Sequence, residues 1–375
     1  MIFHMQINIE VSKFKEALSN ILSVVDKKNS RLILNFIHLK TTHDSIELSA
    51  TDLEVSARIV IPCIVENHGE ICVNAKNIFD IIKELPDDNV NLMVDQSNTN
   101  LKIKCRNINF TLLLLTSEEY PHLHFNSNSN RFELKSEDIL SIINKTNHAI
   151  STDETRIFLN GIYLHEIDGK LRSIATDGYR LAIIETDYDS ESIDVLVNGI
   201  ILPRKGVNEL KKIAEKNPNN RIQLSMDDSY IYMNANEKYF LAVRLIAKDY
   251  LKYQSVIPKK SNSYIDIDRV SFLNALKRIR IMANERSNGV KIHIKENELM
   301  ITANHPSLGD ASEKLPIRYS EKEFEIGFNA KFLIECVSSF EDEDIRLEFN
   351  NELSAVTVKS LKSANFLCVI MPLRL

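Results

Sequence analysis

Three groups of side chains in the sequence are of types that catalysis or metal binding would use. His122 and His124 form an H-x-H pair, residues 341–344 form an E-D-E-D run, and Asp177 precedes Gly178. The histidine pair has no third ligand nearby, and an acidic run after a helix is typical of a solvated turn. An Asp-Gly pair between strands favours a tight turn. We therefore expect no metal, no cofactor and no catalytic group here, although a triad can also be assembled from distant positions.

Glycine and cysteine spacing excludes several common sites. The nine glycines are never closer than seven residues, which rules out the dinucleotide and Walker phosphate loops and the hydrolase nucleophile elbow. The five cysteines are at least nine residues apart, so neither a C-x-x-C pair nor a disulfide framework is expected. With no signal peptide and no apolar run near membrane-spanning length, we expect a cytoplasmic protein without a membrane partner.

The elements that must position any site occur in repeats. The 375 residues are 44% apolar and 26% charged, which predicts globular domains. Helix-periodic segments followed by strand-like alternation recur about every 125 residues, and each repeat contains two such halves. The prediction is an α+β protein of three similar domains, each made of two helix-plus-antiparallel-sheet halves. The expected domains are 1–129, 130–259 and 260–375.

Positive charge is concentrated in the predicted helices. The six helical windows hold 18 basic and 11 acidic residues, a charge of +7, so the remainder carries −13 to reach the total of −6. These windows are 12–28, 75–84, 136–149, 203–217, 268–286 and 330–339. In the fourth, Lys205, Lys212 and Lys216 lie opposite an apolar stripe. A solvated face is one interpretation; the other is sequence-independent contact with the phosphates of a duplex.

The fifth predicted helix has an anomaly. Its core stripe contains Phe272, Leu273, Leu276, Ile279 and Ala283, whereas Ile281 projects roughly to the opposite side. An apolar residue on a wet face is often accidental. Alternatively, Ile281 belongs to an interface.

Two stretches resemble the bacterial DNA sliding clamp family. "ATDGYRLA" at 175–182 is similar to the family's middle-domain loop, and "VIMPLRL" at 369–375 is similar to its C-terminal tail. The similarity covers essentially the full length, including "LNGI" at 159–162 and "EIGFNAKFL" at 325–333. The resemblance implies a head-to-tail homodimer ring with helices lining the hole. Twelve helices spaced about 10 Å apart leave a hole of about 28 Å, enough for duplex DNA, whereas six leave no such room.

The resemblance also implies site residues. A cleft for short partner peptides would be formed by Leu159, Thr176, Gly178, Tyr179, Arg180, Leu181, Tyr319, Leu353, Val369, Ile370, Met371, Pro372, Leu373 and Arg374. The DNA-facing residues would be Lys28, Lys205, Lys212, Lys216, Lys277 and Arg278. The dimer contacts would be Phe110 and Leu112 against Ile281 and Met282. Lys248, Ser287 and a longer 251–256 segment depart from the family's pattern and put cleft contacts from that side in doubt.

The implied function is that of a non-enzymatic processivity clamp in DNA replication, located in the cytoplasm with the nucleoid. Its implied partners are duplex DNA of any sequence, a second copy of the chain, the DNA polymerase III catalytic subunit and an ATP-dependent clamp loader. Other polymerases and repair proteins would bind through short linear motifs. Two alternatives stay open. One is a metal-dependent nucleic-acid enzyme such as a nuclease; the other is a scaffold for proteins only.

Overall fold

The computed structural model describes residues 4–25, 31–126, 130–188 and 195–374. The chain forms two compact units. The first contains Met1–Glu137 and Asn208–Leu245, and the second contains Asp138–Val207 and Ile246–Leu375. In the described ranges, no helix has the length and apolar character needed to cross a membrane.

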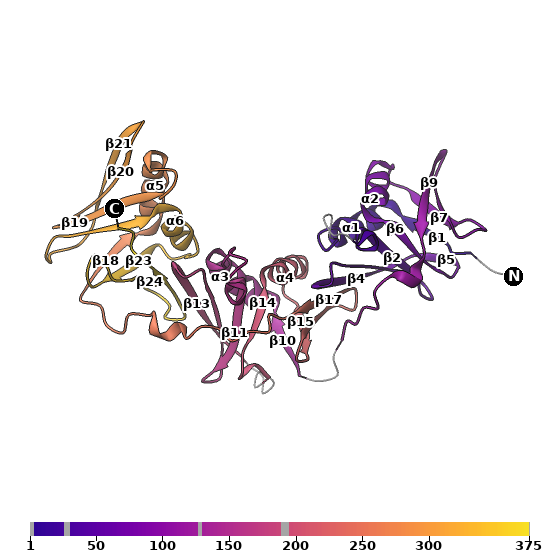
Figure 1. The fold of residues 1–375 in the computed structure, drawn as a ribbon, viewed down its shortest axis with the longest axis horizontal. Coiled ribbons are helices and arrows are strands. Elements are labelled where there is room, and N and C mark those ends of the chain that lie inside the picture. Colours follow the sequence, from indigo (N-terminus) through magenta and orange to yellow (C-terminus); the bar gives the residue numbers. More distant parts are fainter. Residues whose placement is uncertain (1–3, 26–30, 127–129, 189–194, 375) are drawn as a thin grey trace. The chain divides into compact units, whose positions relative to one another are not determined.

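The described α-helices fall in the six windows expected from periodicity (Figure 1). They are α1 (Val11–Ile21), α2 (Ala75–Glu84), α3 (Ser136–Thr146), α4 (Arg204–Lys216), α5 (Arg269–Ile279) and α6 (Ala330–Ser338). Several are shorter than predicted, and the difference is largest for α1 and α5. The turns that follow α1 end it at Ile21, and α5 passes into the 3₁₀ turn η7 (Arg280–Met282). Short 3₁₀ turns at helix ends are frequent, and periodicity alone does not locate them.

The first unit is built on one antiparallel sheet of thirteen described strands. Their order is β10-β15-β16-β17-β4-β3-β2-β6-β9-β8-β7-β1-β5. The bounds are β1 (Gln6–Glu10), β2 (Phe36–Thr41), β3 (Ser45–Thr51), β4 (Val55–Pro62), β5 (Ile64–Asn67), β6 (Glu70–Asn74), β7 (Asn89–Val94), β8 (Asn100–Cys105), β9 (Ile108–Leu115), β10 (Arg131–Lys135), β15 (Arg221–Met226), β16 (Tyr230–Ala235) and β17 (Tyr239–Arg244).

The second unit contains an eight-stranded sheet, β14-β11-β12-β13-β25-β24-β23-β18, and a four-stranded sheet, β21-β20-β19-β22. The bounds are β11 (Gly161–Ile167), β12 (Lys170–Thr176), β13 (Arg180–Asp187), β14 (Ile200–Pro203), β18 (Ser263–Asp268), β19 (Gly289–Lys295), β20 (Glu298–His305), β21 (Gly309–Pro316), β22 (Phe324–Asn329), β23 (Asp344–Phe349), β24 (Val356–Ser360) and β25 (Phe366–Ile370).

A polar residue between strand and helix recurs through the repeat. The Asn74 side chain accepts a hydrogen bond from Asn77 N (3.0 Å), Asp268 from Ser271 N (2.7 Å) and Asn329 from Lys331 N (3.0 Å). Each therefore caps the helix that follows it, namely α2, α5 and α6. Such a cap typically stabilises a helix by about 1 kcal/mol. The polar residue that ends each of these strands is thus the N-cap of the next helix.

The sheets continue across the boundaries expected from sequence. β17 pairs with β4, with Leu241 opposite Ala57, and β13 pairs with β25, with Ala182 opposite Cys368. The expected boundary at 259 lies between the 3₁₀ turn η6 (Tyr253–Ser255) and β18, and 129 lies outside the described residues. The three-domain division at 129 and 259 stays a prediction.

Candidate functional site

The Asp177–Gly178 pair forms the turn between β12 and β13. Asp177 Oδ1 accepts hydrogen bonds from Tyr179 N (2.9 Å) and Arg180 N (3.1 Å). Thr176 Oγ1 donates to Arg180 O (2.6 Å) and accepts from Gly178 N (3.1 Å). Gly178 has φ +87°, a conformation that favours glycine. The tight-turn interpretation is confirmed, and the Asp177 carboxylate holds this turn together.

The loop motif and the C-terminal motif lie side by side. β13 and β25 are antiparallel neighbours, with Arg180 opposite Ile370 and Leu181 opposite Val369. The pairing continues past the strand, because Met371 N donates to Tyr179 O at 2.9 Å. Leu373 N then donates to Gly327 O at 2.8 Å. Residues about 190 positions apart in the chain are therefore joined by continuous backbone pairing.

Leu181 and Val369 belong to a buried apolar cluster. They pack with Ile174, Ile183 and Tyr253, and they are only 3% and 1% exposed. Further side chains that contact this cluster are those of Tyr163, Tyr250, Leu251, Ile257, Ala355 and Leu367. The segment after Lys248, where the sequence departs from the family's pattern, thus packs directly on the predicted cleft wall. Sequence reasoning missed Ile174, Tyr250 and Tyr253.

Hydrogen bonds hold Tyr253 in that position. Its hydroxyl lies 2.9 Å from His165 Nε2 and accepts a hydrogen bond from Arg172 Nη1 at 3.2 Å. Arg172 Nε in turn donates to Glu185 Oε1 at 2.9 Å. Burial, with the nearby Arg172 charge, lowers the pKa of His165. A neutral His165 therefore takes part in this network at neutral pH.

Arg180 is buried, whereas its neighbour Tyr179 is exposed to solvent. Arg180 is 8% exposed, and its guanidinium pairs with Asp177 (Nε–Oδ2, 3.1 Å) and Glu335. It also lies 4.4 Å from the centre of the Phe332 ring, which Tyr179 stacks against at 6.1 Å. Tyr179 is 59% exposed and Met371 is 41% exposed, so these two side chains can meet an incoming partner.

The other predicted cleft residues differ in their surroundings and exposure. Leu159 is buried in the 3₁₀ turn η4 (Ile157–Leu159), and Leu353 is exposed in the turn between β23 and β24, two residues before Ala355. Tyr319 packs against Phe349 instead, and its hydroxyl donates to Lys322 O at 2.7 Å. Pro372 and Leu373 are partly buried, and Arg374 is exposed.

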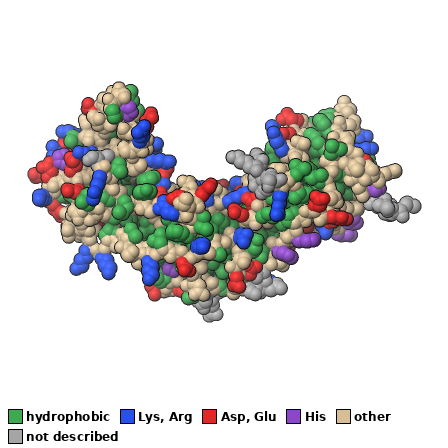
Figure 2. Space-filling view, in the orientation of Figure 1, with side chains coloured by type: hydrophobic (Ala, Val, Ile, Leu, Met, Phe, Trp, Pro, Cys, Tyr) green, Lys and Arg blue, Asp and Glu red, His purple; other side chains and the backbone are tan. Residues whose placement is uncertain are grey.

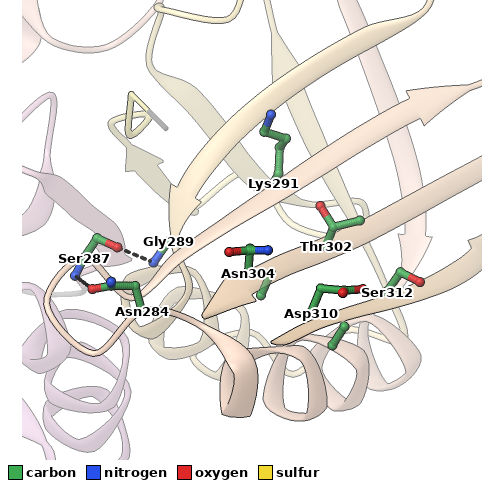
Figure 3. Close-up of a pocket in the computed structure, with 10 residues that line it drawn as sticks. Asn284, Ser287, Gly289, Lys291, Thr302, Asn304, Asp310 and Ser312 are labelled. Atoms are coloured by element: carbon green, nitrogen blue, oxygen red, sulfur yellow. Dashed lines mark hydrogen bonds between the residues drawn. The ribbon is translucent and has the colours of Figure 1, made fainter. Parts of the chain in front are cut away.

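Ser287 lines a polar cavity of about 600 Å³ on the four-stranded sheet (Figure 3). Its hydroxyl accepts a hydrogen bond from Gly289 N at 3.1 Å. The cavity's remaining lining residues are Asn284, Gly289, Lys291, Thr302, Ala303, Asn304, Asp310, Ala311 and Ser312. The lining supplies hydroxyls, amides, the Lys291 ammonium and the Asp310 carboxylate, but it includes no histidine or cysteine for a Ser/His/Asp or Cys/His set.

The histidines and carboxylates singled out in the sequence do not converge. His122, His124 and most of residues 341–344 are exposed, and Ser360 donates a hydrogen bond to Asp342 Oδ1 at 2.6 Å. Over the part of the chain that the structure describes, no three His, Cys, Asp or Glu residues are placed to hold a metal ion.

The basic residues proposed to face DNA differ in their surroundings. Lys212 Nζ pairs with the buried Glu209 at 2.7 Å, and Lys216 pairs with Glu16 at 3.5 Å. Arg278 makes a two-point contact with Glu313 of β21, with Nε 2.9 Å from Oε2. Lys205 is half-buried, Lys277 is exposed, and Lys28 lies outside the described residues.

On the face in Figure 2, Lys and Arg side chains are interspersed with Asp and Glu. Intramolecular pairing therefore offsets part of the positive charge counted in the helices.

Exposed apolar side chains lie on β9 and just beyond α5, next to the edge strand β21. β9 pairs with β8 along its length but with β6 only at Leu114 and Leu115. Its exposed residues include Phe110 (41%) and Leu113 (77%), while Leu112 is half-buried. β21 is the edge of the four-stranded sheet, and α5 contacts it. Beyond α5, Ile281 is 74% exposed and Met282 half-buried, as the sequence anomaly predicted.

Comparison with known proteins agrees with this geometry. Models of the N-terminal, central and C-terminal domains of the DNA polymerase III beta subunit match residues 5–124, 133–252 and 254–374. The beta sliding clamp of Rickettsia bellii is 30% identical over 99% of this chain and all of its own.

Solved structures give the same result. The DnaN sliding clamp of Bartonella birtlesii has a TM-score of 0.95 at 29% identity, covering 99% of this chain and 100% of its own. The Caulobacter crescentus beta sliding clamp has a TM-score of 0.94 at 28% identity and covers both chains completely. The chain therefore belongs to the beta sliding clamp family, the beta subunit of DNA polymerase III.

Proposed function

We propose that this protein forms a closed homodimer ring around duplex DNA and tethers the replicative polymerase to it, without catalysis of its own. The full-length match to beta sliding clamps, in sequence and in fold, is the observation that carries this proposal. A clamp works by topology, so weak, sequence-independent phosphate contacts suffice and permit sliding. Such a protein acts in the cytoplasm, with the nucleoid.

The open edges of β9 and β21 support the dimer. An unpaired strand edge is a ready surface for pairing with another chain, and exposed apolar residues lie on β9 and in η7 beside β21. In the proposed ring, Phe110 and Leu112 of one copy meet Ile281 and Met282 of the other. Leu113 also fits this proposed contact, because it is 77% exposed on the same strand as Phe110.

The surface formed by Tyr179 and Met371 supports the peptide cleft. Exposed aromatic and methionine side chains over a buried apolar base are suited to a small binding hot spot. The Bartonella birtlesii clamp was solved bound to griselimycin, so a ligand-binding surface exists in a protein 29% identical to this one. We propose that short motifs from the DNA polymerase III catalytic subunit, other polymerases, repair proteins and an ATP-dependent loader bind here in turn.

A primer-extension assay tests the proposed function. With the cognate polymerase and loader, addition of the protein should lengthen the product made in a single binding event. The protein alone, with Mg²⁺ or Mn²⁺, should leave both single-stranded and duplex DNA intact. Unchanged product length would refute the processivity role. Metal-dependent cleavage would instead support the nuclease alternative, which the comparisons do not support.

A further inference from the structure

The segment that leads from β17 to β18 crosses the eight-stranded sheet, and we call it the strap (residues 246–262; Figure 1). Its first backbone N–H donates to Ile201 O of β14, at one edge of the sheet, at 3.1 Å. Tyr250 of the strap stacks on Tyr163 of β11, with ring centres 4.6 Å apart. Near the other edge, the side chain of Asn350, directly after β23, donates to a carbonyl of the strap at 2.9 Å. The strap is therefore fixed to the sheet at both ends and between them.

The strap lies on the face of the sheet opposite α6. Its residues Leu251 and Ile257 pack on the buried cluster that contains Val369. Cys368, the preceding residue of β25, points to Ser339 at the end of α6, with Sγ and Oγ 4.0 Å apart. Successive side chains of a strand point to opposite faces. The strap therefore borders the predicted peptide cleft and lies away from this helix.

The strap carries unpaired positive charge. It contains four lysines and one acidic residue, Asp249, a charge of +3 in a chain of −6. All four lysines are exposed, and none forms an ion pair with any residue that the structure describes. Lys212 and Lys216 of α4 differ in this respect, because both pair with glutamates. The strap lysines are Lys248, Lys252, Lys259 and Lys260.

The first unit contains a matching segment without this charge. Residues 116–126 follow β9, and Tyr120 stacks on His38 of β2 with ring centres 5.2 Å apart, as the strap tyrosine stacks on β11. This segment contains Glu118 and Glu119 but neither lysine nor arginine. Packing of such a segment on its sheet therefore does not require basic residues.

The first unit also lacks an apolar cleft at the matching place. Five residues after the threonine that begins each turn, the first unit has Ser56 and the second has Leu181. Their partners on the neighbouring strand are Ala242 and Val369. Above the smaller pair, the Arg58 guanidinium lies 4.8 and 4.4 Å from the centres of two phenylalanine rings. Basic charge therefore accompanies the apolar surface and is absent where that surface is polar.

We propose that the strap makes the cleft selective for peptides that carry acidic residues beside their apolar motif, and that Lys248 and Lys252 contact those residues. This inference rests on the proposed function, because it concerns the cleft assigned there. Lys252 lies between Leu251 and Tyr253, which both belong to the packing under the cleft. Its exposed side chain therefore starts at the margin of the surface that an apolar motif would cover. Charge complementarity of this kind sets partner choice and association rate.

Fluorescence anisotropy titrations of the full-length protein test the inference. The probe is the clamp-binding segment of the cognate DNA polymerase III catalytic subunit, made with three aspartates or three asparagines at its amino end, and again at its carboxyl end. In one of these pairs the aspartate peptide should bind about 2- to 30-fold more tightly, as expected for two exposed ion pairs. Added salt should reduce this preference.

Charge reversal assigns the lysines. In the double variant Lys248→Glu with Lys252→Glu, the preference for aspartate should disappear or reverse, while the affinity for the asparagine peptide stays within a factor of two. Lys248→Gln with Lys252→Gln removes the charge alone and should abolish the preference. The matched control is Lys102→Glu with Lys104→Glu, two exposed lysines of β8 in the first unit, which should retain it. Circular dichroism checks that each variant is folded.

The outcomes separate this inference from the proposed function. Equal affinity of the wild-type protein for aspartate and asparagine peptides, or an unchanged preference after charge reversal, would overturn the inference and leave the cleft in place. Binding of none of the peptides would overturn both. Weaker binding of a short DNA duplex by the reversed variant, with an unchanged peptide preference, would assign the lysines to DNA and also overturn the inference.

Discussion

Substitution of Ile281 by Ala or Asp should weaken or abolish the dimer without harming the fold. Ile281 is 74% exposed in the single chain, so folding gains little from it. Fully burying such a side chain is worth about 1.5–3 kcal/mol, and the exposed share corresponds to about 1–2 kcal/mol. A head-to-tail ring contains the contact twice, which doubles the effect to about 2–4 kcal/mol. For Ile281→Ala, the dimer dissociation constant should therefore rise roughly 30- to 700-fold.

Ile281→Asp should act more strongly, because it places an unpaired carboxylate in the interface. Sedimentation velocity over a dilution series measures both variants. Val270→Asp is the matched control, since Val270 is 50% exposed near the start of α5, the helix that leads into η7, but is not assigned to the interface. Circular dichroism checks that each variant is folded. A dimer of unchanged affinity in Ile281→Asp, or equal weakening by Val270→Asp, would refute the interface assignment.

Three further predictions address the cleft, the turn and the buried histidine. Deletion of residues 371–375 should abolish binding of a fluorescent partner peptide in an anisotropy titration while sedimentation still shows a dimer; unchanged peptide affinity would remove the tail from the cleft. Gly178→Ala should cost about 1–2 kcal/mol and lower Tm by a few degrees, because φ +87° disfavours a side chain. Gly169→Ala is the control, because Gly169 has φ +75° but an added Cβ atom there meets no neighbouring atom. It therefore measures backbone strain without steric crowding. An unchanged Tm for Gly178→Ala would contradict the strain argument. Since burial lowers the pKa of His165 below its ordinary 6.5, the unfolded chain binds the proton more readily, and stability should fall as pH drops through 6.5. In urea titrations, the stability of His165→Gln should depend less steeply on pH than that of the exposed control His122→Gln. Equal slopes of stability against pH would show that His165 does not cause the dependence.

Local patterns predicted most of the helices and the turn. Apolar spacing located all six α-helices of the described residues, and the Asp177–Gly178 turn followed from two residues. Both rest on interactions a few residues apart, which a sequence displays directly. The ends of α1 and α5 were less predictable because the last turns change to other hydrogen-bond patterns.

The features of the site that the sequence did not predict depend on contacts between residues far apart in the chain. Nothing local indicates that Tyr253 covers Leu181 and Val369, because it lies in a short 3₁₀ turn without periodicity. Arg180 is buried against Glu335, 155 positions away. Likewise, Glu209 is 2% exposed on α4, where it pairs with Lys212 and accepts a hydrogen bond from Ser23 Oγ at 3.0 Å. A charge is buried this way only when partners neutralise it, and those partners are visible only in the fold.

Encirclement of DNA is the central claim, and retention on DNA of different topology tests it most directly. The protein is loaded on nicked circular DNA with its cognate loader, and half of the sample is then linearised. Stable retention on circles and rapid loss from the linear molecules is the predicted result, because a closed ring leaves only over an end. Equal retention on both would contradict the account, since it would mean that the protein binds the DNA surface without enclosing it.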